Sequence, residues 1–186
     1  MKIREIAVVR IDFPRSAPTS RPRRRSWAEE AEVANPMSRY PTVKRHRSLW
    51  LPKWEQAWCR VTAEDGNWGI GALPMARLLA PVVEHFASQL VGEECLATDR
   101  LADMMFRMSK PYGTQGLASY AVSAVDLALW DLKGRLLGQP VYRLLGGPLR
   151  DRIFCYATGN DVDWYRELGF RGFKLACPYG PADGRD

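Results

Sequence analysis

The stretch AVSAVDLALWDLKGRLLGQPVYRLLGG, residues 121–147, decides the fold, because it predicts a long helix followed by a tight turn. Apolar side chains fall on every side of this helix: Val122, Val125, Leu127, Leu129, Trp130, Leu132, Leu136 and Leu137. A helix that is apolar all round is normally buried. We therefore expect this helix to lie inside the core, with other elements around it.

Two carboxylates, Asp126 and Asp131, interrupt the apolar pattern. A buried carboxylate is costly unless a partner satisfies it. The two residues are five positions apart, about 140° around a helix with 3.6 residues per turn, so they cannot converge on one metal ion. We expect both to be structural, accepting hydrogen bonds from backbone N–H groups or pairing with arginines such as Arg143 or Arg150.

Composition limits the class of protein. The chain has 186 residues, of which 46% are hydrophobic, enough for one sizeable core or two small domains. Its net charge of +6 permits an anionic substrate or a nucleic acid. No apolar run approaches the roughly 20 residues that cross a bilayer. The cysteines show no zinc spacing and are expected to be reduced, in a cytoplasmic protein: Cys59, Cys95, Cys155 and Cys177.

Hydrophobic periodicity predicts the elements of the first part of the chain. Alternation predicts a strand at 2–13 and a hairpin whose strands lie at 54–64 and 68–73. Helical patterns follow at 74–91, 98–109 and 117–137. Between the first strand and the hairpin, residues 14–48 form a polar stretch rich in Pro, Ser and Arg. A loop of that length is a candidate lid, and we expect it to be mostly irregular.

A strand–helix–strand unit is predicted near the end of the sequence, at 152–159, 161–168 and 169–177. Parallel strands joined by a helix need neighbours that cover both faces of their sheet. These two strands leave the sheet unfinished. We therefore expect that the chain pairs with something else or is a fragment.

The stretch around residues 121–147 resembles a known family at many positions of fixed spacing. The matching residues are Ala121, Ser123, Ala124, Val125, Asp126, Ala128, Leu129, Asp131, Leu132, Gly134, Arg135, Pro140, Val141, Leu144, Leu145 and Gly146. They resemble the mandelate racemase/muconate lactonizing branch of the enolase superfamily. Within it, NPMSRYPTVKRHRSLW (35–50) and GFKLACPYGPADG (172–184) are similar to the rhamnonate dehydratase group of sugar-acid dehydratases.

The resemblance implies an α+β fold. Residues 1–140 are expected to form an enolase-like N-terminal capping domain, an antiparallel meander with three helices. Residues 141–186 are expected to begin a truncated (β/α)7β barrel, with the first β-α-β of an incomplete TIM-type barrel. The family also implies a homo-oligomer.

The chemistry implied is that of a lyase. The family abstracts the proton α to a carboxylate and eliminates a β-hydroxyl, with Mg²⁺ stabilising the developing charge. Its metal ligands and its His–Asp catalytic pair come from later barrel strands. We therefore expect no catalytic residue, no metal ligand and no bound Mg²⁺ in this chain, which would be inactive alone and would supply the substrate-specificity cap. Of the two histidines, His46 and His85, the second is expected to be a surface or packing residue.

Three residues are candidate substrate contacts. Arg47, in VKRHRSLW, corresponds to the cap arginine that contacts the acid sugar in the resembled group. A guanidinium can hold a carboxylate or hydroxyls in a bidentate manner. The companion cap histidine has no counterpart, because its region here is RPRRRSW and carries Trp27. Lys174 ends the predicted second barrel strand and is a candidate supporting charge.

Two alternatives stay open. Racemases and cycloisomerases of the superfamily carry a Lys-x-Lys pair at this strand, where the present chain has Lys174 and then Ala176, so a lysine base is disfavoured. A nucleic-acid-binding module is the alternative from another class, because RPRRR and KRHR are basic runs. No recognition helix or zinc framework accompanies them, and we expect neither nucleic acid nor membrane as a partner.

Overall fold

A computed structural model of the 186-residue chain describes residues 1–12, 20–24, 40 and 55–175. Its contacts divide the chain into two compact units. The meander unit comprises Met1–Phe13 and Trp54–Arg150, and the β-α-β unit comprises Pro14–Lys53 and Asp151–Asp186. The domain boundary expected after residue 140 stays a prediction; the contacts change units at residue 151.

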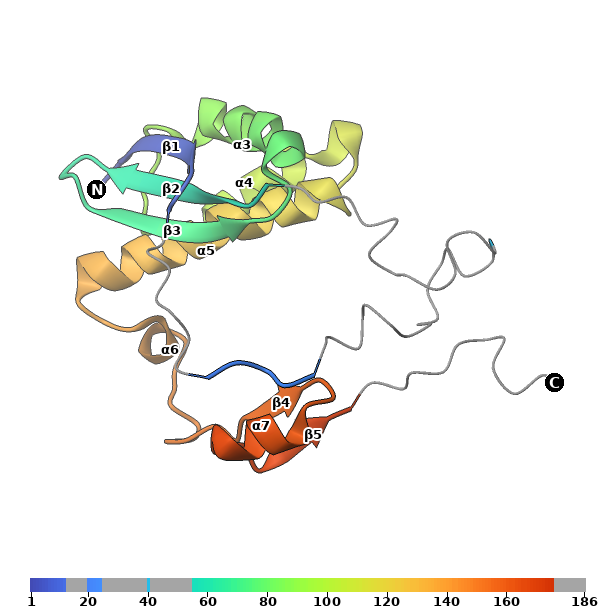
Figure 1. The fold of residues 1–186 in the computed structure, drawn as a ribbon. Coiled ribbons are helices and arrows are strands. Elements are labelled where there is room, and N and C mark those ends of the chain that lie inside the picture. The colour runs from blue at the N-terminus through green and yellow to red at the C-terminus, as the bar shows by residue number, and fades with distance from the viewer. Residues whose placement is uncertain (13–19, 25–39, 41–54, 176–186) are drawn as a thin grey trace. The chain divides into compact units, whose positions relative to one another are not determined.

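The meander unit contains a three-stranded antiparallel sheet of order β1-β2-β3 (Figure 1). Its strands are β1 (Ile3–Val9), β2 (Ala57–Ala63) and β3 (Trp68–Leu73). The predicted hairpin is confirmed, with Val61 opposite Gly69 and Cys59 opposite Gly71. The first strand is shorter than predicted, because the alternation of 2–13 continues past Val9 while the pairing with β2 ends there.

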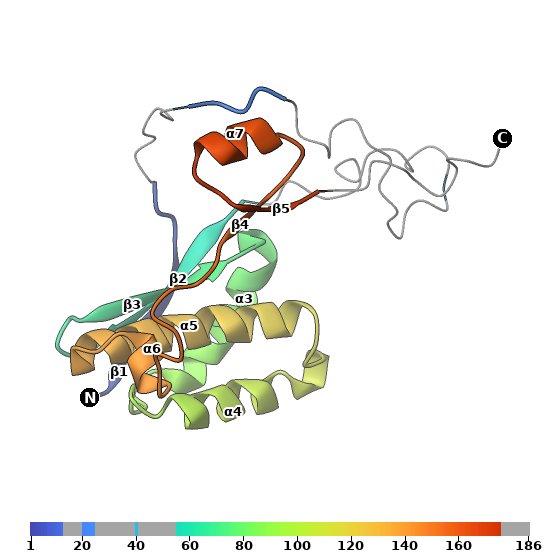
Figure 2. The ribbon, with the colours of Figure 1, turned by 90° about the horizontal axis from the view of Figure 1, so that it is seen from below.

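Helices cover one face of this sheet (Figure 2). They are α3 (Ala76–Leu90), α4 (Thr98–Met108) and α5 (Leu117–Leu137), which the sequence predicted to within two residues at each end. Two short elements were not predicted, the 3-10 turn η2 (Lys110–Tyr112) and the helix α6 (Val141–Leu144). The core between sheet and helices includes Ile3, Cys59, Val61, Leu79, Val83, Phe86, Leu90, Leu101, Met105, Val125, Leu129 and Leu132.

Only part of α5 is buried, so the expectation of a helix enclosed on all sides was wrong. Its buried side is rich in small residues, including Ala121, Ala124 and Ala128. Larger apolar side chains point outward, and Tyr120 and Leu127 are each 50% exposed. The small side chains let the helix backbone approach the sheet, while Val125, Leu129 and Leu132 of the same helix are fully buried in the core.

Both edges of the sheet make contacts beyond the ladder. At the outer edge of β1, the N–H of Ile3 donates to Glu93 O at 2.9 Å and Gly92 N donates to Ile3 O at 2.8 Å. At the outer edge of β3, the N–H of Ile70 donates to Asp131 Oδ2 of α5 at 3.0 Å. Exposed strand edges are sites of unwanted pairing, and both edges are partly satisfied within the unit.

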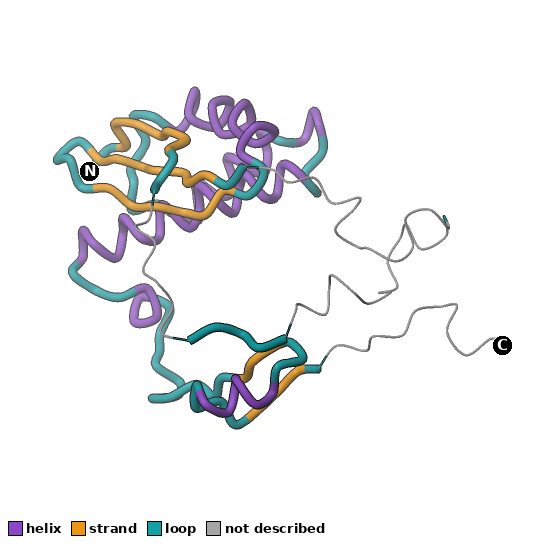
Figure 3. The backbone as a smooth tube through the Cα atoms, viewed as in Figure 1, coloured by secondary structure: helices purple, strands orange, loops and turns teal. Residues whose placement is uncertain are grey.

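The β-α-β unit consists of β4 (Tyr156–Thr158), α7 (Val162–Glu167) and β5 (Gly172–Lys174), two strands and the helix between them (Figure 3). The two strands are parallel. The predicted strand–helix–strand order is confirmed, although each strand is shorter than its apolar run. The α+β architecture expected from the sequence is therefore present. Among the helices of the described ranges, none has the length and apolar content that crossing a bilayer requires.

Candidate functional site

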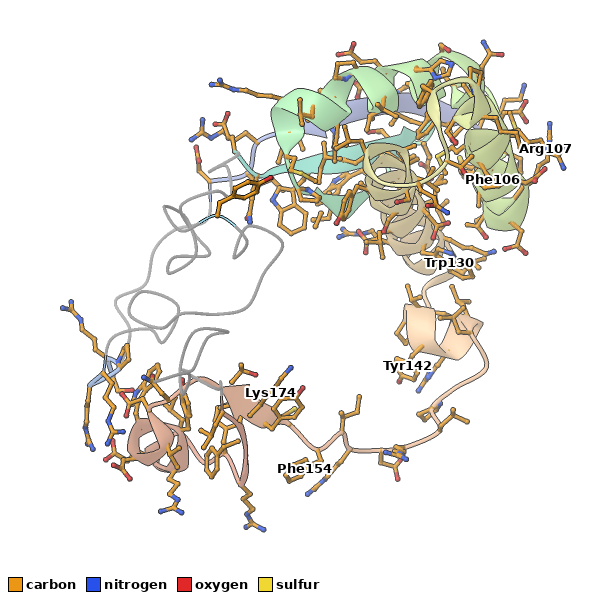
Figure 4. All side chains as sticks on the ribbon, turned by 90° about the vertical axis from the view of Figure 1, so that its right-hand side faces the viewer. Phe106, Arg107, Trp130, Tyr142, Phe154 and Lys174 are labelled. Atoms are coloured by element: carbon orange, nitrogen blue, oxygen red, sulfur yellow. The ribbon has the colours of Figure 1, made fainter. Side chains whose placement is uncertain are left out.

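The carboxyl ends of β4 and β5 lie side by side at one edge of the small parallel sheet. Thr158 is paired with Lys174, and the N–H of Gly159 donates to Lys174 O at 3.1 Å. In open α/β sheets and barrels, ligands bind beyond this end of the strands. Lys174 is exposed there, at the end of β5 (Figure 4). A lysine at this edge can attract an anionic group.

Gly159 and Tyr165 fix the loop that leaves β4. Gly159 has a φ of +145°, and a Cβ at that position would overlap the hydroxyl of Tyr165. That hydroxyl donates to Thr158 O at 3.2 Å, and the Tyr165 ring stacks on Phe173 of β5 with centroids 6.4 Å apart. The loop therefore needs glycine at its first position, so that α7 can close onto the strand ends.

Among the described residues of this unit, Asp161, the N-cap of α7, is the carboxylate with the most hydrogen bonds. Its side chain is 2% exposed. Oδ2 accepts from the backbone N–H groups of Arg23 at 2.5 Å and Arg24 at 3.0 Å, and Oδ1 accepts from Trp164 N–H at 3.4 Å. Burial acts to raise the pKa of Asp161, but these backbone donors outweigh it and the pKa is lowered. The ionised carboxylate is therefore the form that the fold prefers.

Residues 20–24, which we call the strap, are attached to α7 by side chains as well. Trp164 Nε1 donates to Ser20 Oγ at 2.8 Å. The guanidinium of Arg23 pairs with Glu167, and that of Arg24 lies 3.9 Å from Asp163.

The strap contains neither helix nor strand, which agrees with the expected irregular loop over the part that is described. Two arginines of the RPRRR run face carboxylates of their own chain. A basic surface free to bind phosphates is correspondingly smaller than the sequence suggested.

The predicted substrate contacts are only partly within the described residues. Arg47, Trp27 and also His46 lie outside them. Lys174 is the one member of the predicted set whose position is described.

Asp131 is structural, as expected, but its partners differ from those proposed. Its Oδ2 accepts a hydrogen bond from the backbone N–H of Ile70. The same oxygen accepts a second hydrogen bond, at 3.2 Å, from Nε of Arg135 one turn further along α5. Pairing with Arg143 or Arg150 was wrong. An arginine four residues on lies next to the carboxylate on the same helix face, and this local partner outcompetes more distant ones.

Asp126 has no donor among the residues that the structure describes, so its expected pairing was wrong. It is half-buried in a cleft between α4 and α5, of about 450 Å³, that also contains Asp99. Burial, followed by the charge of Asp99, raises the pKa of Asp126. Rings of Phe106 and Trp130 line the same cleft and are labelled in Figure 4.

His85 is an exposed packing residue, as predicted. Its Nδ1 lies 2.9 Å from the hydroxyl of Tyr112, and the two rings meet edge to face at 5.6 Å. Within the described ranges, no three His, Cys, Asp or Glu side chains are grouped as a metal ion would require.

The strap contacts were missed by sequence reasoning. The sequence NDVDW does carry a local signal, because Asp161 before a helix is a preferred N-cap residue. Nothing local indicates that the same carboxylate binds a segment more than 130 residues earlier in the chain. Such a contact is a property of the fold rather than of a motif.

Comparisons with known proteins agree with this architecture. Residues 53–146 match the family described as "Mandelate racemase / muconate lactonizing enzyme, N-terminal domain". An L-rhamnonate dehydratase of Saccharopolyspora erythraea is 40% identical over 160 residues, 85% of this chain and 41% of that protein. A relative from Caldivirga maquilingensis is 41% identical over 154 residues, 82% of this chain and 39% of its own length.

Solved structures give the same picture. The L-rhamnonate dehydratase of Gibberella zeae has a TM-score of 0.82 at 30% identity, covering 99% of this chain and 44% of that one. The 3,6-anhydro-D-galactonate cycloisomerase of Zobellia galactanivorans has a TM-score of 0.59 at 34% identity, covering 64% and 37%. The chain thus spans about two fifths of the length of the curated relatives that it matches.

Proposed function

The chain belongs to the mandelate racemase/muconate lactonizing enzyme family, and we propose that it forms the N-terminal part of a sugar-acid dehydratase of the rhamnonate type. The reaction is removal of the proton α to a carboxylate, followed by loss of the β-hydroxyl as water. The observation that carries the proposal is the 40% identity to an L-rhamnonate dehydratase over 160 residues. In this proposal the chain supplies the substrate-specificity cap and the first β-α-β unit.

Mg²⁺ is the cofactor that the proposal implies, and a rhamnonate dehydratase of Gibberella zeae is known complexed with Mg. A hard divalent cation needs converging oxygen ligands. The described residues of this chain do not fit such a site, since none of their acids and histidines form a group of three. Metal ligands would have to come from outside the described residues.

What this chain offers chemically is recognition of an anion. Lys174 places a positive charge at the carboxyl edge of β4 and β5, where ligands of such sheets bind. Arg47 is proposed to hold the carboxylate or hydroxyls of the acid sugar, and Trp27 to pack against it. The excess of positive charge, +6 over the whole chain, favours the approach of an anionic substrate.

The test uses a chimera in which residues 1–186 replace the matching part of the Saccharopolyspora erythraea relative. We expect dehydration of rhamnonate or of a near isomer, followed as formation of the 2-keto-3-deoxy product. Arg47→Ala should raise KM by roughly tenfold or more, the cost of one charge-assisted contact. Arg77→Ala, at an exposed arginine of α3, is the matched control. A chimera that folds and binds metal but dehydrates no sugar acid of a broad panel would overturn the proposal.

The isolated 186-residue chain is proposed to be inactive, because a TIM-type barrel takes about 250 residues by itself. Calorimetric titration with Mg²⁺ and the same panel of sugar acids should give neither micromolar binding nor turnover. Turnover by the isolated chain would show that the chemistry resides within these residues. A cytoplasmic location and assembly as a homo-oligomer also stay predictions.

A cycloisomerase is the second candidate, because one structural neighbour with that activity is 34% identical over its matched region. The sequence at the end of this strand disfavours a cycloisomerase. Enzymes of the superfamily that use a lysine base carry a Lys-x-Lys pair there, and this chain has Ala176 in place of the second lysine. The chimera distinguishes the two, because a cycloisomerase product retains the elements of water. Nucleic acid is not proposed as a partner, since Arg23 and Arg24 face carboxylates.

A further inference from the structure

The two oxygens of Asp161 have different partners. Oδ1 accepts from the N–H of Trp164 and caps α7, whereas Oδ2 accepts from the N–H groups of Arg23 and Arg24 in the strap. Capping requires one acceptor. The second oxygen is therefore available to bind a segment that lies 137 and 138 residues away in sequence.

We propose that Asp161 is a positioning residue that fixes the strap, and with it the chain direction at Arg24, to the start of α7. Trp27, a proposed substrate contact, follows Arg24 by three residues. The inference deepens the proposed function and rests on it only for the role of Trp27. The attachment itself is independent of any activity.

The nature of the bonds supports a positioning role. The ion pairs of the strap are exposed: Arg23 and Glu167 are 59% and 54% exposed, and Arg24 and Asp163 are 61% and 63% exposed. Exposed ion pairs contribute little. The bonds to Asp161 join a buried carboxylate to backbone N–H groups, which are charge-assisted and hold the main chain itself. They fix the path of the strap whatever its side chains do.

The indole of Trp164 adds a second point of attachment. Its Nε1 donates to Ser20 Oγ at 2.8 Å, at the other end of the strap from Arg24. The strap is thus held near both ends by residues of one helical turn. Two points of attachment determine a direction as well as a position.

The experiment is Asp161→Asn, which removes the negative charge and one of the two acceptor oxygens. Asparagine keeps one carbonyl oxygen and is a preferred N-cap residue. The charge-assisted bonds to the strap become neutral, and the NH₂ group that replaces the second oxygen is a donor that no N–H group can bind. Amide exchange is followed residue by residue by NMR. We expect the protection of the Arg23 and Arg24 amides to fall by roughly tenfold or more, while that of the Trp164 amide stays within a factor of about two.

Trypsin gives an independent readout. Bonds after Arg23 and Arg24 are cleavable, whereas the bond after Arg21 precedes Pro22. Cleavage of a transiently opened segment follows the population of its open form. Asp161→Asn should accelerate cleavage at these two bonds by a similar factor, measured by mass spectrometry of the released peptides. Asp151→Asn, an exposed aspartate of the same unit, is the charge-matched control and should leave both readouts unchanged.

Trp164→Phe keeps an aromatic ring but loses the bond to Ser20, so it should release Ser20 while Arg23 and Arg24 stay protected. Unchanged protection of Arg23 and Arg24 in Asp161→Asn would overturn the inference. So would equal loss at Arg23, Arg24 and Trp164, since that pattern means general unfolding of α7. None of these outcomes depends on turnover. The inference about Asp161 can therefore be overturned while the proposed dehydratase function stands, and the proposed function can be overturned while the inference about Asp161 stands.

Discussion

Gly71 of β3 lies directly against Ala124 of α5, so that a methyl group on Gly71 would overlap the carbonyl oxygen of Ala124 and lie 3.0 Å from its carbonyl carbon. Gly69, two residues earlier on the same face, stands in the same relation to Ala128 and Leu132. The helix therefore crosses the sheet at backbone contact. This contact explains why alanines occupy the positions of α5 that meet Gly69 and Gly71.

Gly71→Ala should destabilise the meander unit by about 3 kcal/mol or more, because the new methyl group meets backbone that no rotamer change can move. Urea denaturation followed by circular dichroism measures the change. Ala72→Ser, on the exposed face of the same strand, is the matched control and should change the free energy of unfolding by less than about 0.5 kcal/mol. Equal stability of Gly71→Ala and the parent would show that α5 does not approach β3 this closely.

Asp131→Leu should cost about 1–3 kcal/mol of unfolding free energy, because the part-buried N–H of Ile70 loses its acceptor. Asp131→Asn keeps a carbonyl oxygen at the same place and loses only the ion pair with Arg135, so its cost should be clearly smaller. Both are measured by urea denaturation at neutral pH. If the two variants were equally unstable, the pair with Arg135 rather than the bond to Ile70 would be the stabilising contact.

Asp126→Asn should stabilise the protein at pH 7. The folded pKa of Asp126 is raised, first by burial and then by Asp99, so the folded state binds a proton more readily than the unfolded chain. Stability from this group is therefore present at low pH and is lost as pH rises above the unfolded value of about 3.9. The difference in unfolding free energy between variant and parent should grow between pH 3.5 and pH 7. A difference that shrinks over this interval would contradict the assignment.

Asp161 should have the opposite pH dependence. Its pKa is lowered, so the stability that it contributes is complete above the unfolded value of about 3.9 and is lost as pH falls through the folded value. Protection of the Arg23 and Arg24 amides should therefore fall on acidification below about pH 4. Arg23 and Arg24 of the strap and Asp163, Arg166 and Glu167 of α7 also bear charge nearby, and subtracting the Asp161→Asn profile isolates the contribution of Asp161. A parent profile identical to that of Asp161→Asn would contradict the prediction.

Cys155 should be the first described thiol to react with an alkylating reagent. It is exposed, whereas Cys59 and Cys95 are fully buried. Burial raises the pKa of Cys59 to about 12, and burial is also the largest cause of the raised pKa of Cys95. Because the thiolate is the reactive form, these two should react only on unfolding. Peptide mapping after timed labelling measures the order, and early labelling of Cys59 would indicate an open sheet.

The meander unit could be predicted from sequence because its signals are local. Alternation places β2 and β3, and α5 begins and ends at the predicted residues, with Gly138 in a left-handed conformation after its last turn. The inside and outside of α5 could not be assigned, since apolar side chains occur all round it. Which side faces the sheet is decided by contact with Gly69 and Gly71, a relation between residues far apart in the chain.

The candidate site was less predictable, for a related reason. A strand-end lysine such as Lys174 is visible in the apolar pattern, and an N-cap such as Asp161 has a sequence signature. The bonds between Asp161 and the strap depend on distances that hydrophobic periodicity does not encode. The same holds for the partner of Asp131, which is Arg135 and not the expected Arg143 or Arg150. The resemblance to a family supplied the chemistry of the site, and its proposed contacts Arg47 and Trp27 stay predictions.

The partly covered edges of the meander sheet restrict how copies of this chain can associate. A fourth strand approaching β3 meets the carboxylate of Asp131 at Ile70, and residues 92–93 already bind the outer edge of β1 at Ile3. Sheet growth from chain to chain, the usual origin of fibrous aggregates, is therefore hindered at these two positions. Exposed apolar surface lies at Leu149, Ile153 and Phe154, which are 96%, 82% and 70% exposed. Polar replacements aimed at improving solubility belong first at these three positions.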